Sequence, residues 1–170
     1  MSNIKIGKTI FRKKEWFISY SDHFNERVEE REIGLERALD LLPALIEDVL
    51  FGDIPMAEYI IERMRHADAH TSENRVQIRD FKNEVCFILA VEPWNRAIVG
   101  VTAMRMRKDE YVNRKTQLIV LDLSSAVERD GETISSLRMF GRNRETGRFE
   151  QLSRTEIDSS ALFFPESDYE

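Results

Sequence analysis

The chain has 170 residues, 42% of them hydrophobic and 33% charged. This length is enough to bury one sizeable core, so the sequence predicts a single globular domain with a tail. A net charge of −6 argues against a general polyanion binder, and the single Cys86 excludes an intrachain disulfide, as is typical of a reducing compartment. No apolar run approaches the ~18 residues that cross a bilayer, and the first residues lack the apolar core of a signal peptide, so we expect a cytoplasmic protein with no membrane partner.

The first expected elements are a short strand and a helix. Residues 15–20 (EWFISY) are rich in aromatic and β-branched side chains, which favours a strand. Ser21 or Asp22 can then cap a helix over residues 22–30. Phe24 and Val28 are four residues apart and would form its apolar edge. Gly34 interrupts the pattern.

Two further helices are expected before the spacing of the apolar side chains changes to that of strands. Residues 35–51 carry apolar side chains at the i, i+3, i+4, i+7 spacing of a core-facing helix. Pro43 should bend or restart this helix, because proline cannot donate a backbone hydrogen bond and its ring crowds the preceding turn. Asp53 and Pro55 then give the start signal of a shorter helix.

The second half of the chain reads as strands. Residues 75–81, 85–91 and 96–104 are joined by short turns, which predicts an antiparallel meander. Residues 117–123 form a fourth strand candidate, and residues 137–141 with 148–152 a terminal hairpin or a helical end. The predicted fold class is therefore α+β, with N-terminal helices packed on a roughly four-stranded antiparallel sheet. We place this domain at residues 1–123 and a C-terminal extension with an acidic tail, packed on or following the same domain, at 124–170.

Three side chains along one side of the first predicted helix are candidate catalytic groups. His23, Arg27 and Arg31 are spaced four apart, so on a helix they line one side next to the apolar edge. Histidine exchanges a proton near neutral pH, and the planar fork of arginine suits a phosphate. These groups could cut RNA without metal, by moving protons at the 2′-hydroxyl and the leaving 5′-oxygen while cations stabilise the phosphorus. The alternative is structural, with His23 capping or packing and the arginines pairing with Glu26, Glu30 or Glu36.

The segment around this stripe resembles a known family. Residues 20–33, YSDHFNERVEEREI, are similar to the Y-S-x-H-x-x-x-R-x-x-x-R-E-I segment of the RegB-type phage early-transcript endoribonucleases, within the RelE-like microbial RNases. The resemblance implies two helices on a four-stranded antiparallel sheet and selective cleavage of messenger RNA that leaves a 2′,3′-cyclic phosphate. By position, His23 and Arg27 match the family's catalytic group.

The sequence departs from the family at the second catalytic histidine, whose place is taken by Pro43. His66 and His70, between the last helix and the first strand of the meander, could supply a second imidazole. Their i, i+4 spacing would also suit a metal pair, or they could simply mark an exposed helix end. We expect no metal and no cofactor.

Two functions of different classes follow. The first is a metal-independent endoribonuclease acting on single-stranded RNA or mRNA, with His23, Arg27 and Arg31 as the catalytic group. Its RNA-binding cations would come from the sheet and the segment after it: Arg79, Arg96, Arg105 and Arg107. The second is a catalytically inactive RelE-like binding protein that uses its charged surfaces for nucleic acid or for a host protein, as a phage-encoded modulator would.

Overall fold

A computed structural model describes residues 3–67, 74–105, 119–129, 132–142 and 146–153. The elements in chain order are β1 (Ile4–Phe11), β2 (Lys14–Tyr20), α1 (Asp22–Glu30), α2 (Leu35–Leu45), the π-helical turn η1 (Ile46–Leu50), α3 (Ile54–Arg65), β3 (Arg75–Asp80), β4 (Val85–Glu92), β5 (Ala97–Arg105), β6 (Ile119–Arg129), β7 (Glu132–Arg142) and β8 (Phe149–Gln151).

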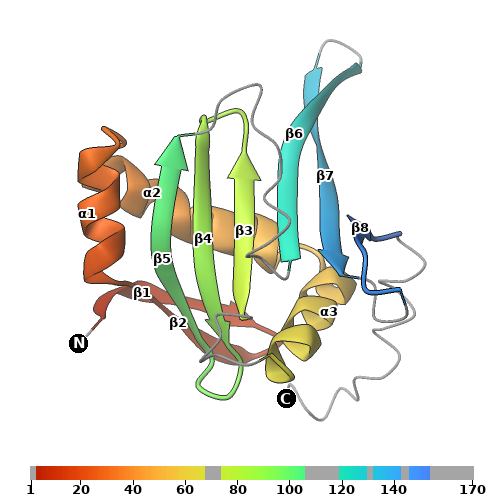
Figure 1. Ribbon diagram of the computed structural model, residues 1–170, viewed down its shortest axis with the longest axis horizontal. Coiled ribbons are helices and arrows are strands. Elements are labelled where there is room, and N and C mark those ends of the chain that lie inside the picture. The colour runs from red at the N-terminus through yellow and green to blue at the C-terminus, as the bar shows by residue number, and fades with distance from the viewer. Residues whose placement is uncertain (1–2, 68–73, 106–118, 130–131, 143–145, 154–170) are drawn as a thin grey trace.

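Within the described residues, all strands join one eight-stranded sheet in the order β1-β2-β5-β4-β3-β6-β7-β8 (Figure 1). β3, β4 and β5 form the antiparallel meander that the sequence predicts. Two neighbouring pairs are parallel, β2 with β5 and β3 with β6. The sheet is therefore mixed, with the meander at its centre.

The predicted fold class is wrong. The helices do not pack on a four-stranded antiparallel sheet, because the sheet has eight strands and two parallel pairs among the described residues. β1 extends it on one side, and β6, β7 and β8 continue it on the other. β6 runs through the predicted boundary at residue 123, and β7 and β8 pair as an antiparallel hairpin. The division into two segments stays a prediction.

The core lies on one face of this sheet. α2 passes behind β5, β4 and β3 in Figure 1. Alternate strand residues such as Ile78, Phe87 and Ile98 point toward the helices and are fully buried, because successive side chains of a strand face opposite sides. The ring of Phe24 on α1 stacks 5.9 Å from that of Phe87, centroid to centroid. These contacts fix α1 against the meander.

α1 lies along the free half of one edge of β5. β2 pairs with β5 through Tyr20 and Gly100, and the chain then leaves the sheet and turns into α1. The backbone N–H of Ser21 donates to the carbonyl of Gly100 at 3.0 Å, which continues the ladder into the helix. Because a bare strand edge would expose unpaired backbone groups, α1 serves as its cover.

The second helix contains a proline and ends in a π-helical turn. Pro43 lies inside α2, and the helix widens into η1 at Ile46. The Phe51 N–H donates to the carbonyl of Ile46 at 2.9 Å, a bond that spans five residues instead of four. The helix therefore does not restart at Pro43, which lies inside α2, and the π-turn begins three residues later. None of the helices in the described part of the chain is long and apolar enough to cross a membrane.

Candidate functional site

The start of α1 is set by Ser21. Its backbone is extended and its hydroxyl accepts from the Phe24 N–H at 3.2 Å, as an N-cap residue does. The same hydroxyl lies 3.3 Å from the carbonyl oxygen of Gly100 and 3.4 Å from that of Val101. One side chain therefore caps the helix and ties its first turn to β5. His23 belongs to this fixed turn.

The end of α1 is closed by a Schellman arrangement. Glu32 adopts a left-handed conformation with φ of 56°, and the Ile33 N–H donates to the Val28 carbonyl at 3.0 Å. Ile33 and Val28 are both buried, which supplies the hydrophobic contact that accompanies this motif. Hydrogen bonds therefore fix both ends of α1, so the backbone that carries the side chains between them is fixed as well.

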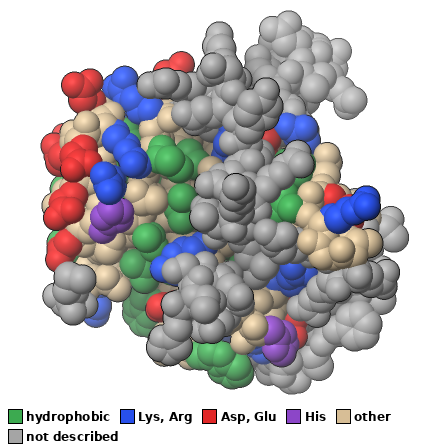
Figure 2. Space-filling model, in the orientation of Figure 1, with side chains coloured by type: hydrophobic (Ala, Val, Ile, Leu, Met, Phe, Trp, Pro, Cys, Tyr) green, Lys and Arg blue, Asp and Glu red, His purple; other side chains and the backbone are tan. Residues whose placement is uncertain are grey.

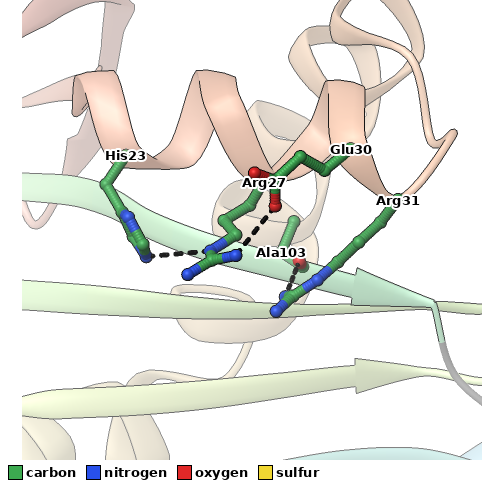
Figure 3. A network of polar contacts seen from close by, with 5 residues as sticks. All are labelled: His23, Arg27, Glu30, Arg31 and Ala103. Atoms are coloured by element: carbon green, nitrogen blue, oxygen red, sulfur yellow. Dashed lines mark hydrogen bonds and ion pairs between the residues drawn. The ribbon is translucent and has the colours of Figure 1, made fainter.

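A continuous polar network lies on the exposed side of α1. The Arg27 Nε donates to the Nε2 of His23 at 3.3 Å, and the Arg27 Nη1 contacts the Oε2 of Glu30 at 2.8 Å (Figure 3). Because Nε2 accepts this hydrogen bond, the contact requires a neutral imidazole with its proton on Nδ1. We call His23, Arg27 and Glu30 the α1 ridge.

The third residue of the predicted stripe points elsewhere. The Arg31 Nη1 donates to the backbone carbonyl of Ala103 on β5, at 2.5 Å (Figure 3). Arg105 on β5 makes a contact in the opposite direction, because its Nη2 donates to the carbonyl of Glu32, just after α1, at 3.0 Å. Arg31 and Arg105 thus hold the end of α1 to the end of β5. Both contacts involve the end of β5, where Ala103 and Arg105 are two residues apart.

Arg79 lies inside the molecule. It is only 5% exposed, and its Nε lies 3.9 Å from the Oδ1 of Asp122 on β6. Arg138 on β7 reaches the other carboxylate oxygen of Asp122 at 2.9 Å. The three side chains form a row across β3, β6 and β7 on the sheet face opposite the helices. A polymer bound at the surface cannot reach a side chain buried to this degree.

The remaining predicted residues lie apart from the α1 ridge. Arg96 is exposed in the turn before β5, whereas Arg105 ends that strand, so the two are about 30 Å apart at roughly 3.3 Å per residue. His66 follows α3 and its Nε2 contacts the Oε1 of Glu62 at 2.8 Å. α1 and α3 lie on opposite sides of the view in Figure 1. Arg107 and His70 fall outside the described residues.

Glu30 is a residue that the sequence indicated only as a structural partner of the arginines, and its pairing with Arg27 is confirmed. Its i, i+3 spacing from Arg27 was sufficient to predict the ion pair, but it indicated only a structural partner. The structure adds that the carboxylate, the guanidinium and the imidazole are connected and that His23 and Glu30 are exposed. Among the described residues, no three His, Cys, Asp or Glu side chains gather as metal ligands do.

The surface around the α1 ridge is divided by charge. In Figure 2, acidic side chains follow the outer border of α1, while basic side chains and a histidine lie between them and the sheet. Exposed acids on the helix include Asp22, Glu26 and Glu29. An approaching anion is therefore favoured on the sheet side of α1 and repelled on its outer side.

Comparisons with protein-family models, with curated proteins and with solved structures find no match to this chain.

Proposed function

We propose that the protein is a metal-independent endoribonuclease that cleaves single-stranded RNA at the α1 ridge. The observation that carries the proposal is the connection of His23, Arg27 and Glu30, of which His23 and Glu30 are exposed and Arg27 is half-buried. RNA cleavage by its own 2′-hydroxyl needs one group to remove a proton, one to deliver a proton and one to stabilise the charge on phosphorus. An ionised carboxylate, an imidazole and a guanidinium meet these three needs.

The roles follow from the charge that each group carries. Glu30 is exposed, and its carboxylate accepts the proton of the 2′-hydroxyl. The 2′-oxygen then bonds to phosphorus and the bond from phosphorus to the 5′-oxygen breaks. His23, in its protonated form, donates to that leaving oxygen. The products are a 2′,3′-cyclic phosphate and a 5′-hydroxyl end, and the proton balance between the two groups is restored by water.

Arg27 occupies the position between the two proton-transfer groups. Its guanidinium contacts His23 on one side and Glu30 on the other, at 3.3 and 2.8 Å. A phosphate that binds the guanidinium competes with both contacts and releases the Nε2 of His23 from Arg27. Substrate binding would thus convert a closed network into a site with an acid, a base and a cation facing the phosphorus. Arg31 and Arg105 add positive charge beside it.

The test is cleavage of a labelled single-stranded RNA by the purified protein in EDTA. We expect products that end in a 2′,3′-cyclic phosphate and no cutting of the matching DNA, which lacks the 2′-hydroxyl. His23→Ala should lower the cleavage rate about 10²- to 10⁴-fold, the range for loss of a general acid or base. Glu30→Gln should have an effect in the same range.

His66→Ala is the matched control. His66 is also exposed and also contacts a glutamate of its own helix, but it follows α3 instead of α1. It should cut at the wild-type rate. Cleavage by His23→Ala at the wild-type rate, with circular dichroism showing an intact fold, would contradict the proposal.

A second candidate is a binding protein that does not cleave. Three observations favour it. Arg27 is engaged by Glu30, and Arg31 is engaged by the Ala103 carbonyl. The other described histidine, His66, follows α3, which lies on the opposite side of the view in Figure 1 from α1. Such a protein would retain RNA with a strong salt dependence and leave it uncut, or would bind a protein partner and no RNA.

A further inference from the structure

One tryptophan is displayed on the surface. Trp94 is 81% exposed, whereas Trp16 is 3% exposed in the core beside Phe51. The guanidinium of Arg65 lies over the Trp94 ring, 5.7 Å from the centroid. Because a ring with this exposure has only one face against Arg65, its other face is open to a planar ligand.

The turn that carries Trp94 is held in one shape. The Asn95 N–H donates to the Glu92 carbonyl and the Arg96 N–H to the Pro93 carbonyl, both at 3.2 Å. Arg96 is in the left-handed region with φ of 48°, as the last residue of such hairpin loops often is. Its carbonyl accepts from the Phe17 N–H at 2.8 Å, which ties the turn to β2. The backbone that carries the ring is therefore fixed by hydrogen bonds, so a ligand that binds the ring orders little additional backbone.

The charge around this ring suits an anion. Arg65 lies over the Trp94 ring, and the exposed Arg96 follows Trp94 by two residues in the same turn. The nearest acid in the chain, Glu92, is close enough to Arg75 to act on its ionisation. Burial lowers the pKa of Arg75, and the charge of Glu92 acts in the opposite direction. Arg96 is exposed, so it places a positive charge on the surface in the same turn as the Trp94 ring.

The strand register places this surface in line with the α1 ridge. Phe17, which is 43% exposed, is the partner of Ala97 at the start of β5, and Tyr20 is the partner of Gly100 further along. α1 begins directly after Tyr20 and Ser21. The path from Arg96 to Gly100 is about 13 Å, at roughly 3.3 Å per residue. Trp94, Phe17 and His23 therefore follow one another along the β2 and β5 pair.

We propose that Trp94, Arg65 and Arg96 form a stacking subsite that holds an unpaired base and its phosphate of a single-stranded RNA, with the strand continuing past Phe17 to the α1 ridge. Base stacking on an exposed aromatic ring beside arginines is the usual means of holding single strands without reading their sequence. This proposal rests on the proposed function for the direction in which the strand continues. Its test measures binding separately from cleavage.

The experiment uses an oligonucleotide of about ten 2′-O-methyl nucleotides, within the ~4–16 nucleotide sites of single-strand binding folds. It lacks a free 2′-hydroxyl, so it binds without being cut. The wild-type protein should lose tryptophan fluorescence on binding, because Trp94 is exposed and Trp16 is buried. Trp94→Ala should bind about 5- to 100-fold more weakly, the loss expected for one stacked base. Trp94→Phe, which keeps a ring, should recover part of the affinity.

Two arginine variants separate a local contact from a general effect of charge. Arg96→Gly removes the cation and keeps a residue that accepts a positive φ, and it should lower the slope of log affinity against log salt by about 0.7. Arg37→Ala removes a similar exposed cation that donates to the Asn83 carbonyl in the β3–β4 turn, at the opposite end of β4. It should leave that slope close to the wild-type value.

The outcomes distinguish this subsite from the nuclease. Equal binding of the oligonucleotide by wild type and Trp94→Ala overturns the subsite, whatever the cleavage assay gives. Failure of the oligonucleotide to bind at any salt concentration also overturns it and leaves Trp94 to a protein partner. Weaker binding by Trp94→Ala, together with undiminished cutting by His23→Ala, supports the subsite and refutes the α1 ridge as the cleavage site.

Discussion

At the scale of single residues, Ser21 links the fold to the candidate site. Its hydroxyl accepts from the first turn of α1 and contacts two carbonyl oxygens of β5. His23 lies in that same turn, and its contact with Arg27 depends on the helix starting where it does. A helix that frays at its first turn would separate the imidazole from the guanidinium.

Ser21→Ala should therefore lower both stability and activity. Loss of an N-cap of this kind costs about 1 kcal/mol of unfolding free energy. We expect a lower urea midpoint with an unchanged slope, and slower RNA cleavage at temperatures well below the transition. Ser21→Thr keeps the hydroxyl and should restore most of both. A Ser21→Ala protein as stable as wild type would show that the hydroxyl contributes nothing to the start of α1.

At the scale of elements, the packing of α1 on β5 depends on the absence of a side chain at Gly100. A Cβ built there would lie 3.1 Å from side-chain carbons of both Leu42 and Phe24. Those carbons belong to α2 and α1, so the two helices meet above one glycine of the strand. The α1 ridge has its position because this approach is close.

Gly100→Ala should destabilise the protein by about 1–3 kcal/mol, because overpacking a core forces neighbouring side chains out of place. Gly7→Ala is the matched control: Gly7 lies on β1, and a Cβ there meets nothing within 4 Å. Thermal and urea unfolding should show a lower midpoint for the first variant and an unchanged or slightly higher one for the second. Equal midpoints would mean that α1 adjusts to the added methyl group without loss.

The elements also show how far the sequence could predict the structure. Phe24 and Val28 indicated the buried side of α1, and the bounds of that helix are confirmed. β1 was missed because its turn gives no usual signal. Arg12 and Lys13 both have positive φ, as in a type I′ turn, where Asn and Gly are preferred over basic residues.

Of the candidate site, the contacts between neighbouring turns of α1 could be predicted from helical spacing. The contact between His23 and Arg27 follows from i, i+4 spacing. Arg31 was expected to continue the stripe, but α1 ends at Glu30 and the open edge of β5 offers it the Ala103 carbonyl. Parallel pairing of β2 with β5 creates that edge, and it joins segments too far apart in the chain for local patterns to specify.

At the scale of the whole molecule, a row of charged side chains, with Arg79 and Asp122 buried and Arg138 half-buried, crosses β3, β6 and β7. β3 and β6 pair in parallel, and Asp122 on β6 contacts Arg79 on one side and Arg138 on the other. A buried ion pair gives little net stability when it is complete, but removing one partner leaves an uncompensated charge away from water. The stability of the pairing between β3, β6 and β7 therefore depends on the single carboxylate of Asp122.

Asp122→Asn should destabilise the protein by about 1–3 kcal/mol, because the Arg138 Nη2 loses a charged hydrogen-bond acceptor and the buried Arg79 loses a nearby negative charge. Glu30→Gln removes a carboxylate from a 2.8 Å ion pair whose carboxylate is exposed, where the expected cost is only about 0–1 kcal/mol. Urea unfolding of the two variants measures the difference directly. Since Glu30→Gln is also expected to lose RNA cleavage, the pair separates a carboxylate that holds the sheet together from one proposed to act on substrate. A large loss of stability in Glu30→Gln would contradict that separation, because its loss of cleavage would then follow from unfolding.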